Sequence, residues 1–347
     1  MKSYRQFLGA VTLGILSALP LPVGGAQGSY KLLKEIPVGG EGGWDYLEVD
    51  PGARRLYVSH ATKVVVIDIE KEAVLGEIAD TPGVHGIAVA PNLGLGFTSN
   101  GRENKVSIFD LKTLQTSSKV DTGENPDAIL YDEKTKEVYA FNGRGRSATA
   151  FDAKTGKVVA TIPLPGKPEF AVAHTKADRI YNNLEDKSEV AVIDTKTHKL
   201  VSTWPLAPGE EPSGMAFDPE HQRLFLGCGN KLMVMLDSAT GKVVSSVPIG
   251  QGVDATKFDP GTQLAFCSCG DATVTIAHED SPDKLTVVQT LKTEPRAKTM
   301  ALDPRTHKIY LASAKFGPAP DQPSGGKKGR PSVVPGTFKV LVYGTAE

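Results

Sequence analysis

The fold of this chain is decided by a pattern that residues 47–68 show first: LEVDPGARRLYVSHATKVVVID. A short apolar segment ends in Asp50-Pro51, a second reads Leu56-Tyr57-Val58-Ser59, and a third ends in Asp68. These segments are rich in β-branched and aromatic residues, and turn-forming residues separate them. The stretch therefore predicts three short strands that pair antiparallel.

The same pattern recurs along the chain with a period close to 42 residues. The junction between the first and second strands falls at Asp50, Ala90, Asp132, His174, Asp218, Asp259 and Asp303, in steps of 40 to 44 residues. The third strand ends at Asp68, Asp110, Asp152, Asp194 and Asp237, with His278 in the sixth place. Short strands at this period are typical of β-propeller blades, and the 3.6-residue period of helical repeats is missing. The sequence predicts an all-β, seven-bladed β-propeller with four-stranded antiparallel blades.

The last blade needs a strand from the other end of the chain. The seventh repeat stops after Phe338–Tyr343 without a fourth strand, whereas residues 30–38, YKLLKEIPV, resemble the fourth strands Val158–Leu164 and Val243–Ile249. We expect this N-terminal strand to close the last blade, because closure removes an open sheet edge. Within blade 7, residues 317–336 contain five Pro and five Gly and predict a Pro/Gly-rich loop.

Residues 1–26 have the pattern of a secretory signal peptide. Lys2 and Arg5 precede the apolar run Phe7–Leu21, and Gly24 and Ala26 are small residues at positions −3 and −1 of a cut after Ala26. The apolar run has about 15 residues, fewer than the roughly 20 of a membrane-spanning helix. We therefore expect a periplasmic or secreted protein without a transmembrane anchor after cleavage.

Composition limits the partners of the expected single propeller domain, residues 27–347. With 39 basic and 40 acidic side chains the formal net charge is −1, which argues against nucleic acid because phosphate contacts need a basic surface. The three cysteines, Cys228, Cys267 and Cys269, allow at most one disulfide and form no disulfide framework. We expect a monomer whose partner is a small polar ligand, a peptide or a protein.

Several second strands resemble a known repeat. Leu56-Tyr57-Val58-Ser59, Phe97-Thr98-Ser99-Asn100 and Val138-Tyr139-Ala140-Phe141-Asn142 are similar to the YVTN-type repeat of secreted seven-bladed propellers, the YncE-like family, often loosely labelled lactonase-like. The resemblance covers essentially the whole mature chain and implies the propeller fold. It leaves the function open, because lactonases, lyases and binding proteins share this shape.

Propeller geometry sorts the polar residues into two faces. The Asp-Pro junctions fall on one face, the turn face, where aspartates suit turns because they accept hydrogen bonds from the backbone two residues on. The opposite face is expected to carry a ring of polar residues that we call the entry ring. Each innermost strand contributes one residue near its start: Asp45, His85, Asp127, Glu169, Ser213, Asp254 and Lys298. Carboxylates that converge on a channel repel one another, which favours a bound cation or raises a carboxyl pKa.

A second ring is expected at the ends of the second strands. It reads His60, Asn100, Asn142, Leu184, Cys228, Cys269 and Ser313, and nearby polar residues are Arg102, Arg144, Asn183, Glu185 and Asn230. His60, Cys228 and Cys269 depart from the Asn that is usual in the resembling family and are types that bind zinc or copper, although they are scattered over separate blades. The other histidines, His174, His198, His221, His278 and His307, are expected on the solvated surface.

Two functional hypotheses follow, of which we favour the first. In the first, the protein is a binding scaffold that captures a small polar ligand or partner at the channel mouth with Asp45, Asp127, Asp254, Arg102, Asn142, Arg144, Asn183, Glu185, Ser213, Asn230 and Lys298. In the second, it is a metal-assisted hydrolase or lyase, in which Ca²⁺, Zn²⁺ or Cu²⁺ is held by Asp127, Glu169, Asp254 and His85. The catalytic residues would then be His85, His60 and Glu169.

Overall fold

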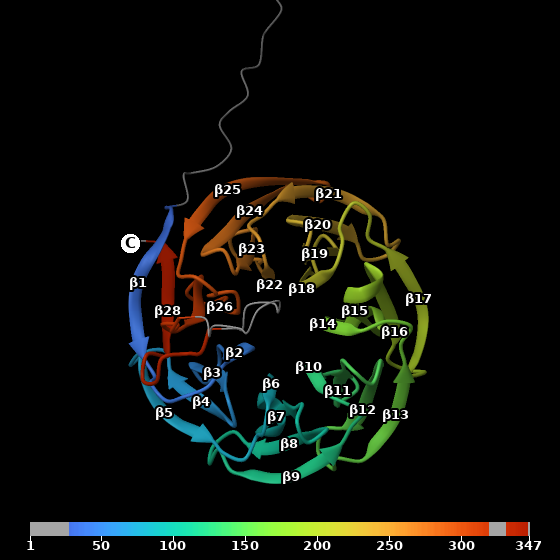
Figure 1. The fold of residues 1–347 in the computed structure, drawn as a ribbon. Coiled ribbons are helices and arrows are strands. Elements are labelled where there is room, and N and C mark those ends of the chain that lie inside the picture. The colour runs from blue at the N-terminus through green and yellow to red at the C-terminus, as the bar shows by residue number, and fades with distance from the viewer. Residues whose placement is uncertain (1–27, 319–330, 346–347) are drawn as a thin grey trace, which may run out of the picture.

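The structure, a computed structural model, describes residues 28–318 and 331–345 as seven four-stranded antiparallel sheets arranged in a ring (Figure 1). The predicted seven-bladed β-propeller is confirmed. The expected signal peptide lies outside the described residues, as does most of the Pro/Gly-rich loop. No helix in the two described ranges is long and apolar enough to cross a membrane.

The blades follow one another in chain order, and each runs from an innermost to an outermost strand. Blades 1 to 3 consist of β2 (Leu47–Asp50), β3 (Arg55–His60), β4 (Lys63–Asp68) and β5 (Ala73–Ile78); β6 (Val84–Ala90), β7 (Leu95–Asn100), β8 (Lys105–Asp110) and β9 (Thr116–Asp121); and β10 (Pro126–Asp132), β11 (Glu137–Asn142), β12 (Ser147–Asp152) and β13 (Val158–Pro163). Blades 4 and 5 consist of β14 (Pro168–His174), β15 (Arg179–Leu184), β16 (Glu189–Asp194) and β17 (Lys199–Pro205); and β18 (Pro212–Asp218), β19 (Arg223–Cys228), β20 (Leu232–Asp237) and β21 (Val243–Pro248). Blade 6 consists of β22 (Val253–Asp259), β23 (Leu264–Cys269), β24 (Thr273–Ser281) and β25 (Lys284–Lys292). The inner strands end at the predicted junctions.

Blade 7 is closed by both ends of the propeller chain, as predicted. It consists of β26 (Met300–Asp303), β27 (Lys308–Ser313), β28 (Lys339–Thr345) and, as its outermost strand, β1 (Tyr30–Pro37). β1 pairs antiparallel with β28, and the Tyr30 hydroxyl donates a 2.6 Å hydrogen bond to the carbonyl oxygen of His307. In Figure 1 the two strands lie side by side at the edge of the ring.

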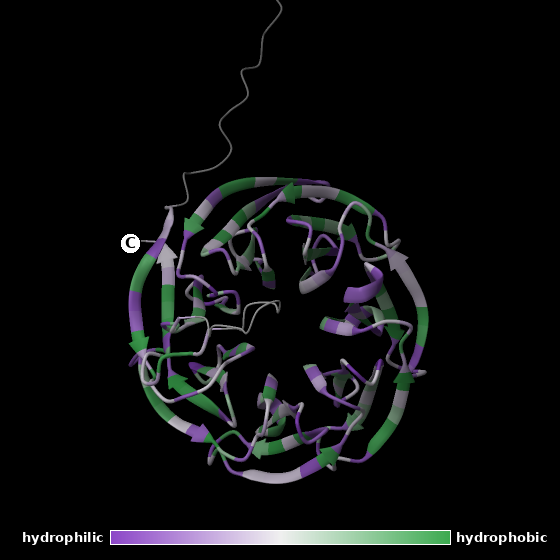
Figure 2. Ribbon diagram, in the orientation of Figure 1, coloured by the Kyte–Doolittle hydropathy of each residue, from purple (hydrophilic) through white to green (hydrophobic). Residues whose placement is uncertain are grey.

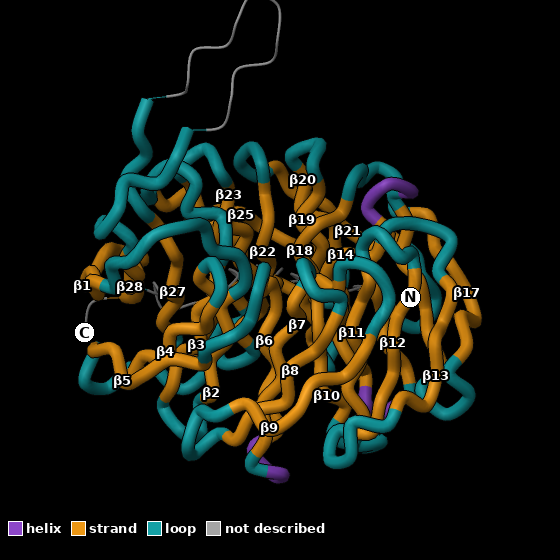
Figure 3. Tube along the Cα trace, turned by 60° about the horizontal axis from the view of Figure 1, so that its bottom comes forward, coloured by secondary structure: helices purple, strands orange, loops and turns teal. Residues whose placement is uncertain are grey.

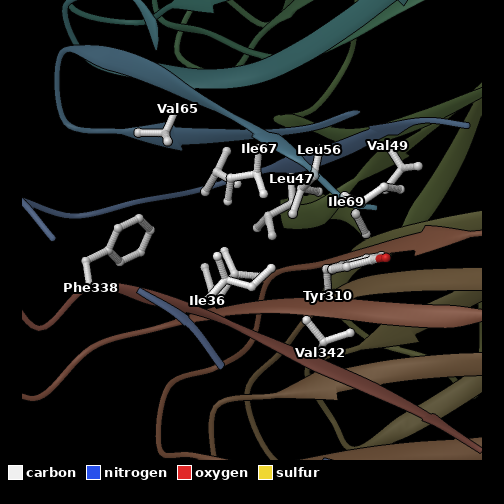
Figure 4. Close-up of a cluster of buried hydrophobic side chains, with 14 of the residues drawn as sticks. Ile36, Leu47, Val49, Leu56, Val65, Ile67, Ile69, Tyr310, Phe338 and Val342 are labelled. Atoms are coloured by element: carbon white, nitrogen blue, oxygen red, sulfur yellow. The ribbon is translucent and has the colours of Figure 1, made fainter. Parts of the chain in front are cut away.

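Hydrophobic residues between neighbouring blades form the core. Figure 2 shows most of the hydrophobic segments on the strands, whereas the connecting loops are mainly hydrophilic. Between blades 7 and 1, Ile36, Phe338 and Val342 face Leu56 and Ile67, and each of these five side chains is at most 1% exposed (Figure 4). Middle strands are apolar at successive positions because each blade is covered on both faces by its neighbours. Figure 3 shows that the loops gather at the two ends of the strands, which form the two faces of the ring.

The repeated aspartates of the turn face act as turn formers. Asp50 Oδ1 accepts hydrogen bonds from the backbone N–H groups of Gly52 and Ala53, and Asp152 Oδ1 accepts from the backbone N–H and the hydroxyl of Thr155, both at 2.7 Å. These hydrogen bonds hold the pKa of the Asp152 carboxyl below its usual range. The turn assignment made from the sequence therefore agrees with the geometry.

The Asp152→Ala substitution is expected to lower the free energy of unfolding by about 0.5–2 kcal/mol, as for other side-chain-to-backbone caps. Because the folded-state pKa of Asp152 is depressed, its contribution is present above the unfolded value near pH 4 and is lost as the pH falls. Urea unfolding at pH 7 measures the loss, with Lys154→Ala in the same turn as the control. An unchanged midpoint in Asp152→Ala would contradict the turn-forming role.

Candidate functional site

The entry ring lies where the innermost strands begin, on the face opposite the turn face, and we call this end of the ring of blades the channel mouth. His85, Asp127, Glu169, Ser213 and Asp254 are each the second residue of an innermost strand. The pairing register shifts across each of them, for example between Val84 and Ile87 in β6, so that His85 has no partner in the ladder. A bulge leaves a residue out of the ladder and re-aims its side chain, which frees these side chains from the sheet.

Three ring residues from blades 1 to 3 form a polar cluster at the mouth. His85 Nδ1 lies 2.7 Å from Asp45 Oδ2 and 3.9 Å from Asp127 Oδ1, and its Nε2 lies 3.3 Å from the amide nitrogen of Asn125. The Asp127 carboxylate accepts no hydrogen bond from any described residue, and 17% of its side chain is exposed. Asp45, His85 and Asp127 therefore form a recessed cluster in which one carboxylate lacks a donor.

Lysines neutralise part of the remaining ring. Lys167 Nζ lies 2.5 Å from both Glu169 Oε1 and Glu185 Oε2, and Lys298 Nζ lies 2.8 Å from Asp254 Oδ1. Ser213 donates a 3.3 Å hydrogen bond to the carbonyl oxygen of Asp254. The entry ring and its contacts thus comprise five carboxylates, counting Glu185, two lysines and one histidine, and the arginines of the adjacent cavity add further positive charge.

The electrostatics of the ring follow from burial and mutual repulsion. Burial and the neighbouring Asp45 raise the pKa of Asp127 to about 6, and burial and Asp127 raise the pKa of Glu169 to about 8. Burial lowers the pKa of His85, but the hydrogen bond to Asp45 and the charge of Asp127 outweigh it and raise the pKa to about 9. Near neutral pH, His85 is therefore protonated and Asp127 is ionised.

The Glu169→Gln substitution is expected to stabilise the fold above neutral pH. The folded-state pKa of Glu169 exceeds its unfolded value, so ionisation of this carboxyl destabilises the folded chain. This destabilisation is absent below about pH 4.5 and is complete above about pH 8. The loss of one Lys167 partner offsets part of the gain, and we expect about 1–3 kcal/mol at pH 9 and little at pH 5. Thermal unfolding at both pH values measures this gain in stability. The control is Glu185→Gln, which changes the more exposed carboxylate partner of Lys167. A gain in stability that does not grow with pH would contradict the prediction.

A cavity of about 770 Å³ opens beside this cluster. Asp45 and His85 line it together with Arg102, Arg144 and the amide of Asn125, and its other lining residues are Gly43, Trp44, Ala61, Gly83, Val84, Gly101, Asn104 and Glu124. Both arginines are exposed, and neither forms a salt bridge with a described residue. The cavity therefore has an acidic side and two guanidinium groups that are free to bind an anion.

Gly101 and Gly83 make room for these groups. A Cβ atom on Gly101 would lie 2.7 Å from His85 Nε2 and 2.5 Å from the Asn125 amide nitrogen, closer than real Cβ contacts. Gly83, with φ of +67°, accommodates the aliphatic stem of Arg102 in the same way. A second cavity of about 600 Å³ shares Trp44 and Asp45 with the first and reaches Arg296, Lys298 and Phe316.

The second ring is part of the core, which corrects its assignment to the ligand site. His60 is 1% exposed and stacks on Phe338 at 4.3 Å, and Asn142 is fully buried with its amide donating to Ser147 and Thr149. Asn183 is also fully buried and donates to the carbonyl oxygen of Ser213. None of the three lines either cavity at the mouth, because second strands are covered on both faces by neighbouring blades.

Two other predicted groups have different surroundings from those expected. Asn230 donates to the carbonyl oxygen of Pro208 and accepts from the backbone of Glu210, so its amide holds a loop. The three cysteines are buried and free, and burial raises the pKa of the Cys228 and Cys269 thiols to about 12. Within the described part of the chain, His60 and the cysteines do not join a group of three metal-ligating side chains.

Four of the remaining histidines are partly exposed, as expected, but each also pairs with a carboxylate, whereas His174 is buried. His198, His221, His278 and His307 each lie within 3.2 Å of a carboxylate oxygen, and His174 is 9% exposed and packs on Phe217.

Sequence reasoning also missed Lys167 and Asn125, each two residues before a ring residue. The sequence offered one indication of these two residues: each is a polar residue in the loop that leads into a ring residue.

Comparisons with known proteins identify the fold and no more. No family model matches the sequence, and no curated protein matches it. Among solved structures, a chain of hydrazine synthase from Kuenenia stuttgartiensis is similar, with a TM-score of 0.70 and 16% sequence identity over 78% of this chain and 92% of that chain. At this identity the similarity shows a shared β-propeller architecture alone.

Proposed function

We propose that this protein is an exported binding scaffold that captures a small zwitterion, a molecule with both a cationic and an anionic group, at its channel mouth. The observation that carries the proposal is the Asp127 carboxylate, which is recessed, ionised near neutral pH and without a hydrogen-bond donor among the described residues. It lies 3.9 Å from His85, which lines the cavity that Arg102 and Arg144 also line.

The two sides of the cavity would bind opposite ends of the ligand. Arginine guanidinium groups bind carboxylates through paired, charge-assisted hydrogen bonds, and Arg102 and Arg144 come from neighbouring blades that open onto the same space. On the other side an ammonium group would bind Asp45, which lines the cavity, and would supply a donor to Asp127, which lies 3.9 Å from His85 behind the lining residues. A cavity of about 770 Å³ falls within the range of small-molecule sites.

Isothermal titration calorimetry with three classes of probe tests this proposal. L-lysine and glycylglycine represent zwitterions, succinate a dianion and putrescine a dication, each at pH 7.5 and low ionic strength. We expect the better zwitterion to bind at least tenfold more tightly than succinate and putrescine, because only it satisfies both sides of the cavity. Equal or tighter binding of either single-sign probe would overturn the proposed ligand class.

A metal-assisted hydrolase or lyase is the second candidate, and one observation favours it. The nearest ligand atoms of Asp45, His85 and Asp127 lie within 4.8 Å of one another, a spacing that a divalent cation can bridge. The 2.7 Å hydrogen bond between His85 Nδ1 and Asp45 competes with this reading, because it must break before Nδ1 can bind a metal. Metal uptake by dialysed protein at pH 7.5 and pH 9 distinguishes the enzyme from the binding scaffold. The enzyme requires stoichiometric metal, and the Asp127→Asn variant is then expected to lose it.

Export and family membership belong to the same proposal. The pattern of residues 1–26 supports export to the periplasm or beyond, and the YVTN-like second strands support a place among the YncE-like propellers. A zwitterion binder in that location would meet its ligand outside the cytoplasm. Fractionation of cells that express the full chain tests the location.

A further inference from the structure

A second polar cluster lies on the turn face, between blades 5 and 6. Asp218 ends β18, His221 lies in the turn that follows, and Glu279 lies near the end of β24 in the next blade. His221 Nδ1 is 3.0 Å from Asp218 Oδ2 and 3.2 Å from Glu279 Oε1. We call these three residues the interblade cluster, and none of them is used at the channel mouth.

Burial distinguishes this cluster from an ordinary surface ion pair. The side chains of Asp218 and Glu279 are both 0% exposed, whereas 30% of the His221 side chain is exposed. Glu279 Oε2 is buried and has no hydrogen-bond partner in the part of the chain that the structure describes. An unsatisfied carboxylate oxygen next to a second buried carboxylate is costly, because neither charge is solvated by water.

The other blades show that this carboxylate is not required by the fold. The residue at the corresponding position, directly after the third-strand junction, is Ile69, Leu111, Ala153, Thr195 or Ser238 in blades 1 to 5. Leu111 is partly buried and the other four are buried. The position of His221 is held by Thr135, Thr262 and Thr306 in blades 3, 6 and 7. Blades 5 and 6 thus replace two residues of ordinary propeller turns by potential metal ligands, and they do so at one contact between blades.

The charges around the cluster do not neutralise it. Arg223 acts on Glu279 only through its charge, and its guanidinium donates to Asp237 and Asp283. Asp218 and Glu279, both buried, share one imidazole between them, and a divalent cation would balance their charge.

We propose that the interblade cluster is a divalent transition-metal site that takes Zn²⁺ through Asp218 Oδ2, His221 Nδ1 and Glu279. Zn²⁺ accepts one imidazole and two carboxylates at bond lengths of about 2.0–2.2 Å, and tetrahedral geometry then puts the ligand atoms about 3.3 Å apart. The exposed edge of His221 is the open side, from which the ion enters and a water molecule completes the coordination. The ion ties blade 5 to blade 6.

Titration of the metal-free protein with ZnCl₂ at pH 7.5 tests the site, with His221→Thr and Glu279→Leu as the variants. Both replacements are the residues that other blades carry, so the fold is expected to persist, and Glu279→Leu is expected to melt no lower than the metal-free native chain. We expect each variant to lose one equivalent of bound Zn²⁺, or at least 100-fold in affinity, and to lose the rise in melting temperature that Zn²⁺ gives the native chain.

Two controls separate this site from other histidines. His307→Ala removes a histidine of the same face that pairs with buried Asp259 at 2.7 Å but has no third ligand among the described residues, and Asp127→Asn alters the channel mouth. Both controls are expected to keep the equivalent that the interblade variants lose. The proposal would be overturned if the native chain binds no Zn²⁺, or if the His221→Thr variant binds as many equivalents as the native chain. If Glu279→Leu does not fold, the result for His221→Thr alone decides.

Discussion

A chain that lacks Tyr30–Pro37 is expected to lose its cooperative unfolding transition. This strand is the outermost strand of blade 7, and its removal leaves the whole edge of β28 unpaired. It also removes Tyr30 and Ile36, which are 4% and 1% exposed, from the cores on the two faces of blade 7. Truncation of one buried Ile costs about 2–5 kcal/mol, and a typical domain is stable by only about 5–15 kcal/mol.

Circular dichroism melting and size-exclusion chromatography measure this loss, with a chain that begins at Gly28 as the folded reference. A graded pair within β1 checks the cause: Ile36→Ala is expected to cost about 2–4 kcal/mol and Leu32→Ala, at a residue that is 46% exposed, less than about 1 kcal/mol. A truncated chain that melts cooperatively near the temperature of the reference would show that closure by β1 is dispensable.

The double substitution Arg102→Gln/Arg144→Gln is expected to weaken binding of the best zwitterion by about 100-fold or more. Each charge-assisted hydrogen bond contributes about 1.5–3 kcal/mol, and the variant removes those of two guanidinium groups. Stability is expected to change by less than about 0.5 kcal/mol, because both side chains are exposed and neither has an ion-pair partner among the described residues.

Arg146→Gln is the matched control for this prediction. Arg146 lies two residues after Arg144, is similarly exposed and pairs with Asp186 at 2.8 Å, but it does not line the cavity. Calorimetry should therefore give the native affinity for Arg146→Gln. An equal loss in both proteins would mean that general surface charge, and not the two cavity arginines, attracts the ligand.

The repeat pattern predicts the fold almost completely. Turn aspartates such as Asp50 and Asp218 recur because every blade needs the same turn, so local hydrogen bonding leaves a periodic mark in the sequence. The closing strand was predictable for the same reason, since Tyr30–Pro37 repeats the pattern of other outermost strands. The positions of the entry-ring residues at the starts of the inner strands follow directly from this periodicity.

Burial and pairing between blades were beyond the reach of the sequence. His60 and Asn142 occupy positions equivalent to loop-side residues, but the neighbouring blades cover them, and that packing depends on distant side chains such as Phe338. Lys167 and Glu279 contact partners that are 18 and 58 residues away in the sequence, respectively. Because such contacts have no fixed spacing, only the folded ring brings them together.

A crystal structure of the chain saturated with the tightest zwitterion of the panel tests the central claim most directly. The account predicts that the ligand occupies the 770 Å³ cavity, with its anionic group within hydrogen-bond distance of Arg102 or Arg144 and its cationic group against Asp127 or Asp45. A ligand on the turn face, or one in the cavity that contacts neither the arginines nor the carboxylates, would contradict it.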